Sequence, residues 1–242
     1  MVNVRSSQSL KKFLFVIFSL LFIVLTVLAY FFLINRPDST MRSTRVMEWI
    51  RYPNKHPEWA VAAGDRCENA PFNIPTNGYI GFLWDDSFRP GHHHTGLDIF
   101  GGTDGGITPI YAVYDGYLTR QSDWKSTVII RIPSDPLQPD RQIWTYYTHM
   151  ADEQGNGFIS EDFPPGTSEV SVKAGTLLGY QGNFSGTPGN PTGVHLHFSV
   201  VKDDGDGQFL NETNLENTLD PSPYFNINLN ANQSPPEIPI CP

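Results

Sequence analysis

Two histidine-containing stretches, far apart in the chain, place the strongest constraint on what this sequence folds into. Residues 94–98 read His-Thr-Gly-Leu-Asp, and residues 195–198 read His-Leu-His-Phe. Side chains alternate between the two faces of a β-strand, so a strand at each stretch gathers its polar groups on one face. Those groups are His94 and Asp98 in the first stretch and His195 and His197 in the second. We therefore predict two strands that face one metal ion, with Gly96 leaving room for the ion or a substrate.

The residue types in these stretches favour a catalytic zinc site. A catalytic zinc ion takes three protein ligands, drawn from imidazole and carboxylate groups, and keeps a fourth position for water. Four such groups lie in the two stretches, and a further imidazole, His149, follows a third predicted strand. Three of these groups suffice to hold the ion. The remaining imidazoles are then available for proton transfer and for binding a developing oxyanion.

The clustering of the histidines favours a metal site. A single histidine is more often a solvated or hydrogen-bonded side chain than a metal ligand. The chain has seven histidines, and only His56 lies outside the segments described above and their immediate neighbours. A chance distribution would scatter them. His92 and His93 extend the first stretch into a triplet, which is also typical of a weak surface metal trap. We assign these two residues no role as ligands.

The same residues resemble a known family. His-Xaa-Gly-Xaa-Asp at 94–98, Tyr-Xaa-His at 147–149 and Gly-Xaa-His-Leu-His-Phe at 193–198 are similar to the signature of the LytM/lysostaphin-type zinc metalloendopeptidases. Members of that family cut peptide cross-links of bacterial cell walls. The similarity spans residues 79–225 and includes Ala-Val-Tyr-Asp-Gly at 112–116 and Leu-Asp-Pro at 219–221.

The resemblance implies a fold, a cofactor and a role for each candidate residue. The implied fold is mainly β, an antiparallel β-sheet or sandwich peptidase domain of the duplicated hybrid motif type. The implied cofactor is Zn²⁺, bound by His94, Asp98 and His197. His149 and His195 are then the catalytic residues, one as general base and the other as oxyanion stabiliser, in either order. The implied partners are the stem peptides or cross-bridges of peptidoglycan.

Residues 13–34 form an uncharged apolar run that is long enough to cross a bilayer as a helix. A cleaved secretory signal is the alternative, but the run exceeds a usual signal core and no small-Xaa-small cleavage site follows it. Arg5, Lys11 and Lys12 precede the run and no acidic residue does, which favours a cytoplasmic N-terminus. We therefore predict a cytoplasmic segment at 1–12, a transmembrane helix at 13–34 and a domain in the periplasm or at the cell surface.

Charge is distributed unevenly between the N-terminal segment and the rest of the chain. Six of the 16 basic residues lie within the first 45 positions, together with only one of the 25 acidic residues. The remainder is therefore strongly acidic. Binding to nucleic-acid phosphates depends on clustered Lys and Arg, so we expect no nucleic-acid partner.

From residue 78 the sequence reads as an antiparallel β domain that extends to residue 225. Short runs rich in aromatic and β-branched residues alternate with Gly, Asp and Pro. The clearest predicted strands are, in chain order, 110–113, 127–132, 143–148, 177–180 and 195–201. The segments between them at 133–142, 151–168 and 182–193 read as surface loops, the last of them forming a wall of the site.

The segments on either side of this domain have a different character. Residues 35–77 read as a stem with short helical pieces, interrupted by Pro53 and Pro57, that packs onto the domain. Residues 226–242 read as a Pro/Asn-rich tail. The triplet Asn211-Glu212-Thr213 fits a glycosylation pattern that is frequent by chance, and we assign it no function.

The chain has two cysteines, Cys67 before the β domain and Cys241 near its end. Neither has the spacing of a zinc finger. In an oxidising compartment a disulfide between them is expected, and it would tie the tail to the stem. Two unpaired buried thiols are the alternative.

These observations together predict a membrane-anchored zinc metalloendopeptidase that hydrolyses peptide cross-links of peptidoglycan. One alternative is a non-catalytic wall-binding regulator of the same fold, but such proteins lose metal ligands and this sequence keeps all of them. A second alternative is a phosphotransfer carrier with paired histidines on a related duplicated β fold. The apolar anchor, the acidic domain and the aspartate among the ligands argue against a carrier.

Overall fold

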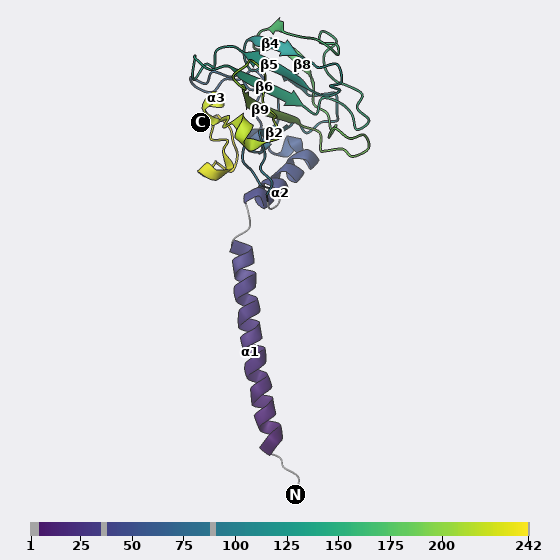
Figure 1. Ribbon diagram of the computed structural model, residues 1–242. Helices are drawn as coiled ribbons and strands as arrows, with labels where there is room; N and C mark the ends of the chain where they lie inside the picture. The colour runs from purple at the N-terminus through teal and green to yellow at the C-terminus, as the bar shows by residue number, and fades with distance from the viewer. Residues whose placement is uncertain (1–4, 35–37, 88–90, 242) are drawn as a thin grey trace. The chain divides into compact units, whose positions relative to one another are not determined.

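The structure is a computed structural model that describes residues 5–34, 38–87 and 91–241 (Figure 1). The chain divides into two units, residues 1–41 and residues 42–242. The first unit contains helix α1 (Arg5–Ile34), and the large apolar side chains that the structure describes between Phe13 and Tyr30 are exposed. Nowhere in the described ranges is there a helix with both the length and the apolar character needed to cross a membrane. A helix thus forms over the predicted segment 13–34, but its assignment as a transmembrane helix is not supported.

The segment that leads into the β domain is helical, as its sequence predicts. Helix α2 (Asp38–Arg51) is followed by two single 3₁₀ turns, η1 (Pro53–Lys55) and η2 (Pro57–Trp59). Proline fits the first position of a helical turn because it has no N–H to leave unsatisfied there, and both turns begin with one. The prediction of short helical pieces interrupted by prolines is therefore confirmed.

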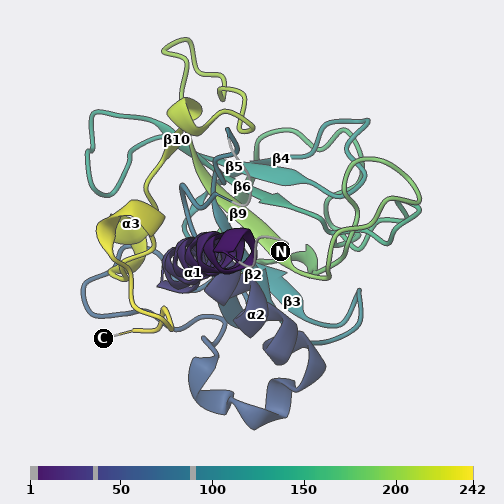
Figure 2. The same ribbon diagram turned by 90° about the horizontal axis from the view of Figure 1, so that it is seen from below.

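The second unit is built on an eight-stranded sheet in which every pair of neighbours is antiparallel. The strand order is β1-β2-β9-β6-β5-β4-β7, with β10 also paired to β9. Figure 1 shows the central part of this order, from β2 through β9, β6 and β5 to β4. Figure 2 shows the same strands from below. A separate two-stranded sheet pairs β3 with β8. The strands are β1 (Tyr79–Phe82), β2 (Leu97–Phe100), β3 (Pro109–Tyr111), β4 (Gly116–Thr119), β5 (Val128–Ile132), β6 (Ile143–Thr148), β7 (Val170–Val172), β8 (Leu177–Tyr180), β9 (Leu196–Lys202) and β10 (Thr218–Leu219).

Three short helical elements complete the C-terminal part: η3 (Leu215–Asn217), α3 (Ser222–Phe225) and η4 (Ala231–Gln233). Tyr224 and Phe225 of α3 are buried in the main hydrophobic core. Ile227 and Leu229, which follow α3, are buried there as well. The start of the predicted tail therefore contributes apolar side chains to the core of the domain.

The antiparallel β fold predicted from the sequence is confirmed. The predicted strands at 143–148 and 177–180 coincide with β6 and β8, and the other three overlap β3, β5 and β9 with small shifts at their ends. The remaining strands β1, β2, β4, β7 and β10 are short, two to four residues each, and only β2 belongs to a stretch expected to be extended. The domain boundaries at 78 and 225 stay predictions.

The predicted disulfide between Cys67 and Cys241 is confirmed, with 5.2 Å between the two Cα atoms and 174 positions between them in the sequence. Cys67 lies in the main hydrophobic core, and Cys241 packs against that core. The bond therefore joins the segment before β1 to the segment after η4 at the edge of the main core.

We expect removal of this disulfide to destabilise the protein substantially. A cross-link that closes so long a loop restricts the unfolded chain, and loss of a native disulfide typically costs about 2–5 kcal/mol. The Cys67→Ser/Cys241→Ser double variant leaves no free thiol, so its urea unfolding midpoint is compared directly with that of the oxidised wild-type chain. Coinciding unfolding curves would show that the bond does not contribute to stability.

Candidate metal centre

The centre of the main sheet supplies two of the predicted ligands. Strand β9 lies between β2 and β6, and its His197 pairs with Asp98 of β2 on one side and with Thr148 of β6 on the other. Leu196 and Phe198 alternate with His197 and point into the main core, where both are fully buried. The alternation predicted for this strand therefore holds, and it directs His197 to the face opposite the main core.

The first stretch is only partly a strand, so the predicted strand geometry of His94 is wrong. Strand β2 begins at Leu97, three residues after His94. The loop after β1 fixes His94 instead: its backbone N–H donates to the carbonyl of Asp86 at 2.8 Å, and its Nδ1–H donates to the carbonyl of Leu83 at 2.8 Å. The position of this imidazole is thus set by hydrogen bonds to a neighbouring loop rather than by strand alternation.

Gly96 is required for a reason other than the one its sequence position suggests. A Cβ atom at this residue would lie 2.1 Å from the carbonyl oxygen of Phe198 and 2.4 Å from Ser199 Oγ, both on β9. The missing side chain therefore allows the backbone of the first stretch to approach β9 closely. The sequence-based prediction that Gly96 leaves room for an ion or a substrate is therefore wrong.

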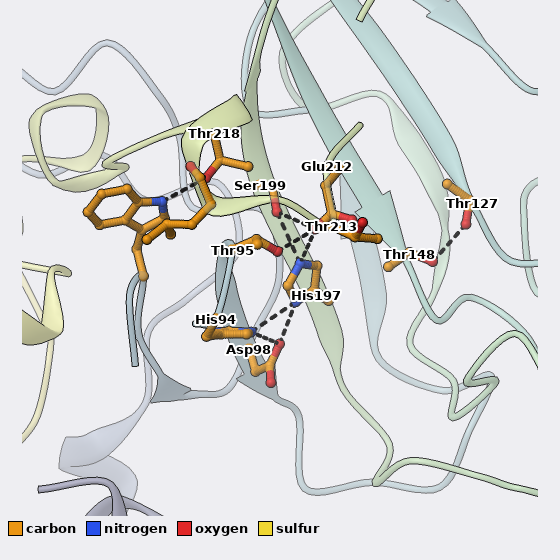
Figure 3. Close-up of polar contacts among 12 residues, drawn as sticks. His94, Thr95, Asp98, Thr127, Thr148, His197, Ser199, Glu212, Thr213 and Thr218 are labelled. Carbon is orange, nitrogen blue, oxygen red and sulfur yellow. Dashed lines mark hydrogen bonds and ion pairs between the residues drawn. The ribbon is translucent and has the colours of Figure 1, made fainter. Parts of the chain in front are cut away.

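His94, Asp98 and His197 come together in a compact group of three donor atoms (Figure 3). His94 Nε2 lies 3.0 Å from Asp98 Oδ1 and 3.0 Å from His197 Nδ1. His197 Nδ1 lies 2.8 Å from Asp98 Oδ1. All three side chains are buried. The structure thus brings together the three residues that the sequence proposes as metal ligands.

Hydrogen bonds from the outside orient both imidazoles of this group. A carbonyl oxygen can only accept, so the bond to Leu83 requires the proton of His94 on Nδ1 and leaves Nε2 for the centre. On the other side, His197 Nε2 lies 2.8 Å from Glu212 Oε1, which leaves Nδ1 for the centre. Metal-binding histidines in proteins are commonly held in this way by a carbonyl or carboxylate on their second nitrogen.

Glu212 is a site residue that the sequence analysis missed. Its carboxylate also accepts hydrogen bonds from Thr95 Oγ1 at 2.7 Å and from Ser199 Oγ at 3.1 Å (Figure 3). The residue lies in the segment between β9 and η3, within a triplet that carries no motif for metal chemistry. Only the path of that segment back over β9 brings the carboxylate to His197.

The electrostatics of the group follow from burying two carboxylates beside imidazoles. Burial opposes ionisation of Asp98, but the adjacent His94, His195 and His197 outweigh burial and hold the pKa of this carboxyl well below its ordinary value. Burial likewise opposes ionisation of Glu212, yet its bonds to His197 lower its pKa to about 2. Burial disfavours the charged form of His197, whereas hydrogen bonds to Asp98 and Glu212 raise its pKa to about 10.

These features fit a divalent metal ion such as zinc. Zinc binds imidazole nitrogen and carboxylate oxygen at about 2.0–2.2 Å, so donors in a tetrahedral site lie about 3.3 Å from one another. The three donors here are separated by 2.8–3.0 Å, a few tenths of an ångström less. Because the pKa of His197 is raised to about 10, a metal ion that binds its Nδ1 would have to displace a proton from this imidazole.

Two further imidazoles, His149 and His195, lie beside the three donors. Their ring centroids are 4.6 Å apart, and His195 Nε2 lies 3.4 Å from Asp98 Oδ1. His149 Nδ1 donates to the carbonyl of Phe184 at 2.7 Å, and His195 Nδ1 donates to the carbonyl of Gly193 at 2.6 Å. In the neutral form of each ring, Nε2 then carries the free lone pair. The structure therefore brings all five predicted site residues together.

His149 stands in an unusual backbone conformation at the end of β6. Its φ of 72° lies in the left-handed region, which few residues other than glycine and asparagine adopt readily. Burial, together with the nearby His195 and His197, lowers the pKa of its imidazole to about 3. This side chain is therefore neutral near pH 7, as a proton acceptor must be.

The other histidines of the first stretch have different surroundings. His93 is largely exposed, and its Nδ1 lies 2.5 Å from Asp85 Oδ1. Neither His92 nor His93 belongs to the group of three donors.

The fold and the site define a class, an antiparallel β-sheet protein with a candidate three-donor metal centre beside two further histidines. No family model and no curated protein matches the chain. Among solved structures, the chain resembles LytM/lysostaphin-type peptidases. Lysostaphin from Staphylococcus simulans shares 17% sequence identity over 69% of this chain and 55% of its own, with a TM-score of 0.38. A variant of the catalytic domain of the prophage-encoded protein EnpA from Enterococcus faecalis shares 22% over 63% of this chain and 95% of its own, with a TM-score of 0.35.

The match thus spans about half the length of lysostaphin. Sequence identities this low describe a likeness of fold. The chemistry of the metal centre rests on this chain's own residues.

We expect Glu212→Gln to weaken metal binding without unfolding the protein. The amide keeps the size of the side chain but loses the negative charge that favours the bound orientation of His197, and such outer partners contribute about 10–100-fold to metal affinity. Competition with a chromophoric chelator measures the zinc dissociation constant. Glu216→Gln, on the neighbouring turn η3 and outside the group, is the matched control. Equal zinc affinities for Glu212→Gln and the wild type would remove Glu212 from the site.

Proposed function

We propose that this protein is a zinc-dependent endopeptidase that hydrolyses peptide cross-links of peptidoglycan. The observation that carries the proposal is the arrangement of five side chains: three convergent donors and, beside them, two imidazoles whose Nδ1 atoms donate to backbone carbonyls. A structural metal site has no use for two extra imidazoles at its open side. A zinc hydrolase can use them as general base and as oxyanion stabiliser.

His94, Asp98 and His197 would hold the ion. When bound, zinc lowers the pKa of a water molecule towards neutrality and polarises the carbonyl of the peptide bond. His149 is neutral and offers Nε2 to accept a proton from the attacking water. His149, which then carries that proton, can pass it to the leaving amine. His195 lies beside His149, with ring centroids 4.6 Å apart, and in its protonated form its Nε2–H can donate to the negative charge of the tetrahedral intermediate.

A groove for a peptide runs past these residues. A cavity of about 510 Å³ opens over the centre and is lined mainly by polar side chains of β6, of the segment just before β5 and of the loops that carry His94, Ser185 and Glu212. Its walls include Thr127, Tyr146 and Thr148. Hydroxyl groups of this kind can donate to and accept from the backbone of an extended peptide.

The experiment that tests the proposal is digestion of purified peptidoglycan by the zinc-loaded full chain, with mass spectrometry of the released fragments. Cleavage of a peptide bond, lost on chelation and restored by zinc, is the expected result. Intact peptidoglycan in the presence of protein with stoichiometric zinc would reject the proposal and favour the non-catalytic wall-binding alternative.

We also propose that the domain lies outside the cytoplasm and that the segment at 13–34 attaches it to a membrane. The Cys67–Cys241 disulfide supports an oxidising compartment. Exposed apolar side chains along α1, such as Phe13 and Phe22, support contact with lipid. Fractionation of cells that express the full chain tests the attachment: extraction from the membrane fraction by detergent but not by alkaline carbonate is expected, and recovery in the soluble fraction contradicts it.

A further inference from the structure

A second cavity, of about 450 Å³, also opens at the metal centre and has a largely different lining from the polar groove. His94, His149 and His197 line both cavities, so the two meet at the centre. The walls of the second cavity away from the centre are mainly apolar and come from α2, β1 and β2. They comprise Ser43, Val46, Met47, Ile50, Phe82 and Phe100, and His92, Thr192 and Gly193 complete the lining outside the centre.

One face of α2 forms the outer wall of this cavity. Ser43, Val46, Met47 and Ile50 all line it, and their spacing of three, four and seven residues places them on one stripe of the helix. Met47 is 56% exposed and Ile50 is 40% exposed, although both are large apolar side chains. The helix therefore presents apolar surface to the space beside the metal centre.

Contacts on its other side hold α2 firmly in this position. Arg42 forms a buried two-bond ion pair with Asp86, at 2.6 and 2.9 Å. Trp49 is buried, and its Nε1–H donates to the carbonyl of Phe100 at 2.6 Å. Asp86 in turn accepts the backbone N–H of His94, so the helix and a metal ligand are attached to the same loop. Figure 2 shows α2 beside β2. The apolar wall thus has a fixed position relative to the centre.

The floor of the cavity is aromatic and leads directly to the site. The ring of Phe100 stacks on His195 with centroids 4.9 Å apart, and Phe82 meets Phe100 edge to face at 5.9 Å. Among the described residues that line the cavity, none is Lys, Arg or Glu, and Asp98 of the centre is the one acidic residue. Among these described residues, a charged side chain would find only Asp98 and the lining histidines to pair with, whereas an aliphatic one would leave water at no electrostatic cost.

We propose that this cavity is a specificity subsite that takes an aliphatic side chain of the peptide, next to the bond that is cut. The inference rests on the proposed peptidase function and deepens it: the α2 wall selects apolar residues on one side of that bond and disfavours charged ones. Met47 and Ile50 determine this selectivity. Glycine fits the site but leaves the subsite empty.

The test uses the zinc-loaded full chain and two probes, one of which does not depend on turnover. Glycine hydroxamate and leucine hydroxamate share a metal-binding group and differ in one aliphatic side chain, and calorimetry compares their affinities. Pentaglycine and its variants with one leucine or one aspartate at each position are compared by kcat/KM. An apolar pocket distinguishes side chains that differ in size by about 10–200-fold, so the leucine probes are expected to be preferred at least tenfold.

Met47→Asp places a carboxylate on the exposed face of α2, where folding tolerates it, and is expected to reduce the preference for leucine at least tenfold with zinc content unchanged. Val170→Asp is the control. It also replaces an exposed apolar side chain by a carboxylate, but on β7 at the far edge of the sheet, and it is expected to keep the preference for leucine. Ile50→Ser, which adds no charge, is expected to reduce the preference in the same direction as Met47→Asp.

The outcomes separate the subsite from the enzyme. If no peptide is cut but leucine hydroxamate is preferred and Met47→Asp removes that preference, the peptidase function fails and the subsite stands. Equal affinity of the wild type for the two hydroxamates overturns the subsite, whatever the peptides show. Concentration-dependent dimerisation that Met47→Asp abolishes, with no preference for leucine, also overturns it, because a second copy of the chain then covers the cavity.

Discussion

The His197→Ala variant is expected to lose tightly bound zinc. His197 contacts every other residue of the group. Its Nδ1 lies within hydrogen-bond distance of Asp98 and His94, and its Nε2 lies within hydrogen-bond distance of Glu212. Removing the imidazole takes away one of three donors and leaves Asp98 and Glu212 without the ring that lies between them. Because outer partners alone contribute about 10–100-fold to metal affinity, loss of a direct donor should cost at least about 100-fold.

Elemental analysis after dialysis against a weak chelator measures this effect, and the rate of peptide cleavage should fall below detection together with the metal. His93→Ala is the matched control because it removes a nearby histidine that lies outside the group of three donors. Stoichiometric zinc in His197→Ala, or equal losses in both variants, would refute the ligand assignment. Melting temperatures of the zinc-free proteins separate loss of the metal from loss of the fold.

The largest effect expected without loss of metal comes from His149. The side chain lies beside the donors but is not one of them, and its neutral imidazole is proposed to accept a proton in the chemical step. General acid–base catalysis of this kind typically contributes about 10²–10⁴-fold to the rate. Replacing His149 should therefore lower kcat by that factor while zinc content stays at the wild-type level.

The choice of replacement matters because of the backbone at this position. With φ at 72°, an alanine would be strained, whereas asparagine adopts the left-handed region more readily. His149→Asn thus removes the imidazole and preserves the turn. Single-turnover cleavage at saturating substrate, with zinc measured in the same sample, reports the chemical step. A wild-type rate in His149→Asn would exclude His149 from the mechanism, and a loss of zinc would instead make it part of the metal site.

Local sequence determined much of the centre. Alternation in β9 directs His197 to the face opposite Leu196 and Phe198, because apolar side chains there must be buried in the core. The strands β6 and β8 were predicted with their observed bounds since their apolar and aromatic residues lie between clear turn signals. The sequence also determines which chemistry the five candidate residues offer, because imidazole and carboxylate groups bind metal ions and transfer protons.

Tertiary structure decided how those groups are held and what surrounds them. The proton of His94 is fixed by the carbonyl of Leu83, and the orientation of His197 by Glu212, both from loops whose course no local pattern describes. The sequence predicts that Gly96 leaves space for an ion, whereas in the structure this glycine lets the backbone of the first stretch approach β9 closely. The sequence predicts a stem over the residues of α2, and only the structure shows that this helix forms the apolar wall beside the centre. Side-chain chemistry is a property of each residue, so the sequence determines it; distances between segments far apart in the chain depend on packing of the whole domain, so only the folded structure decides them.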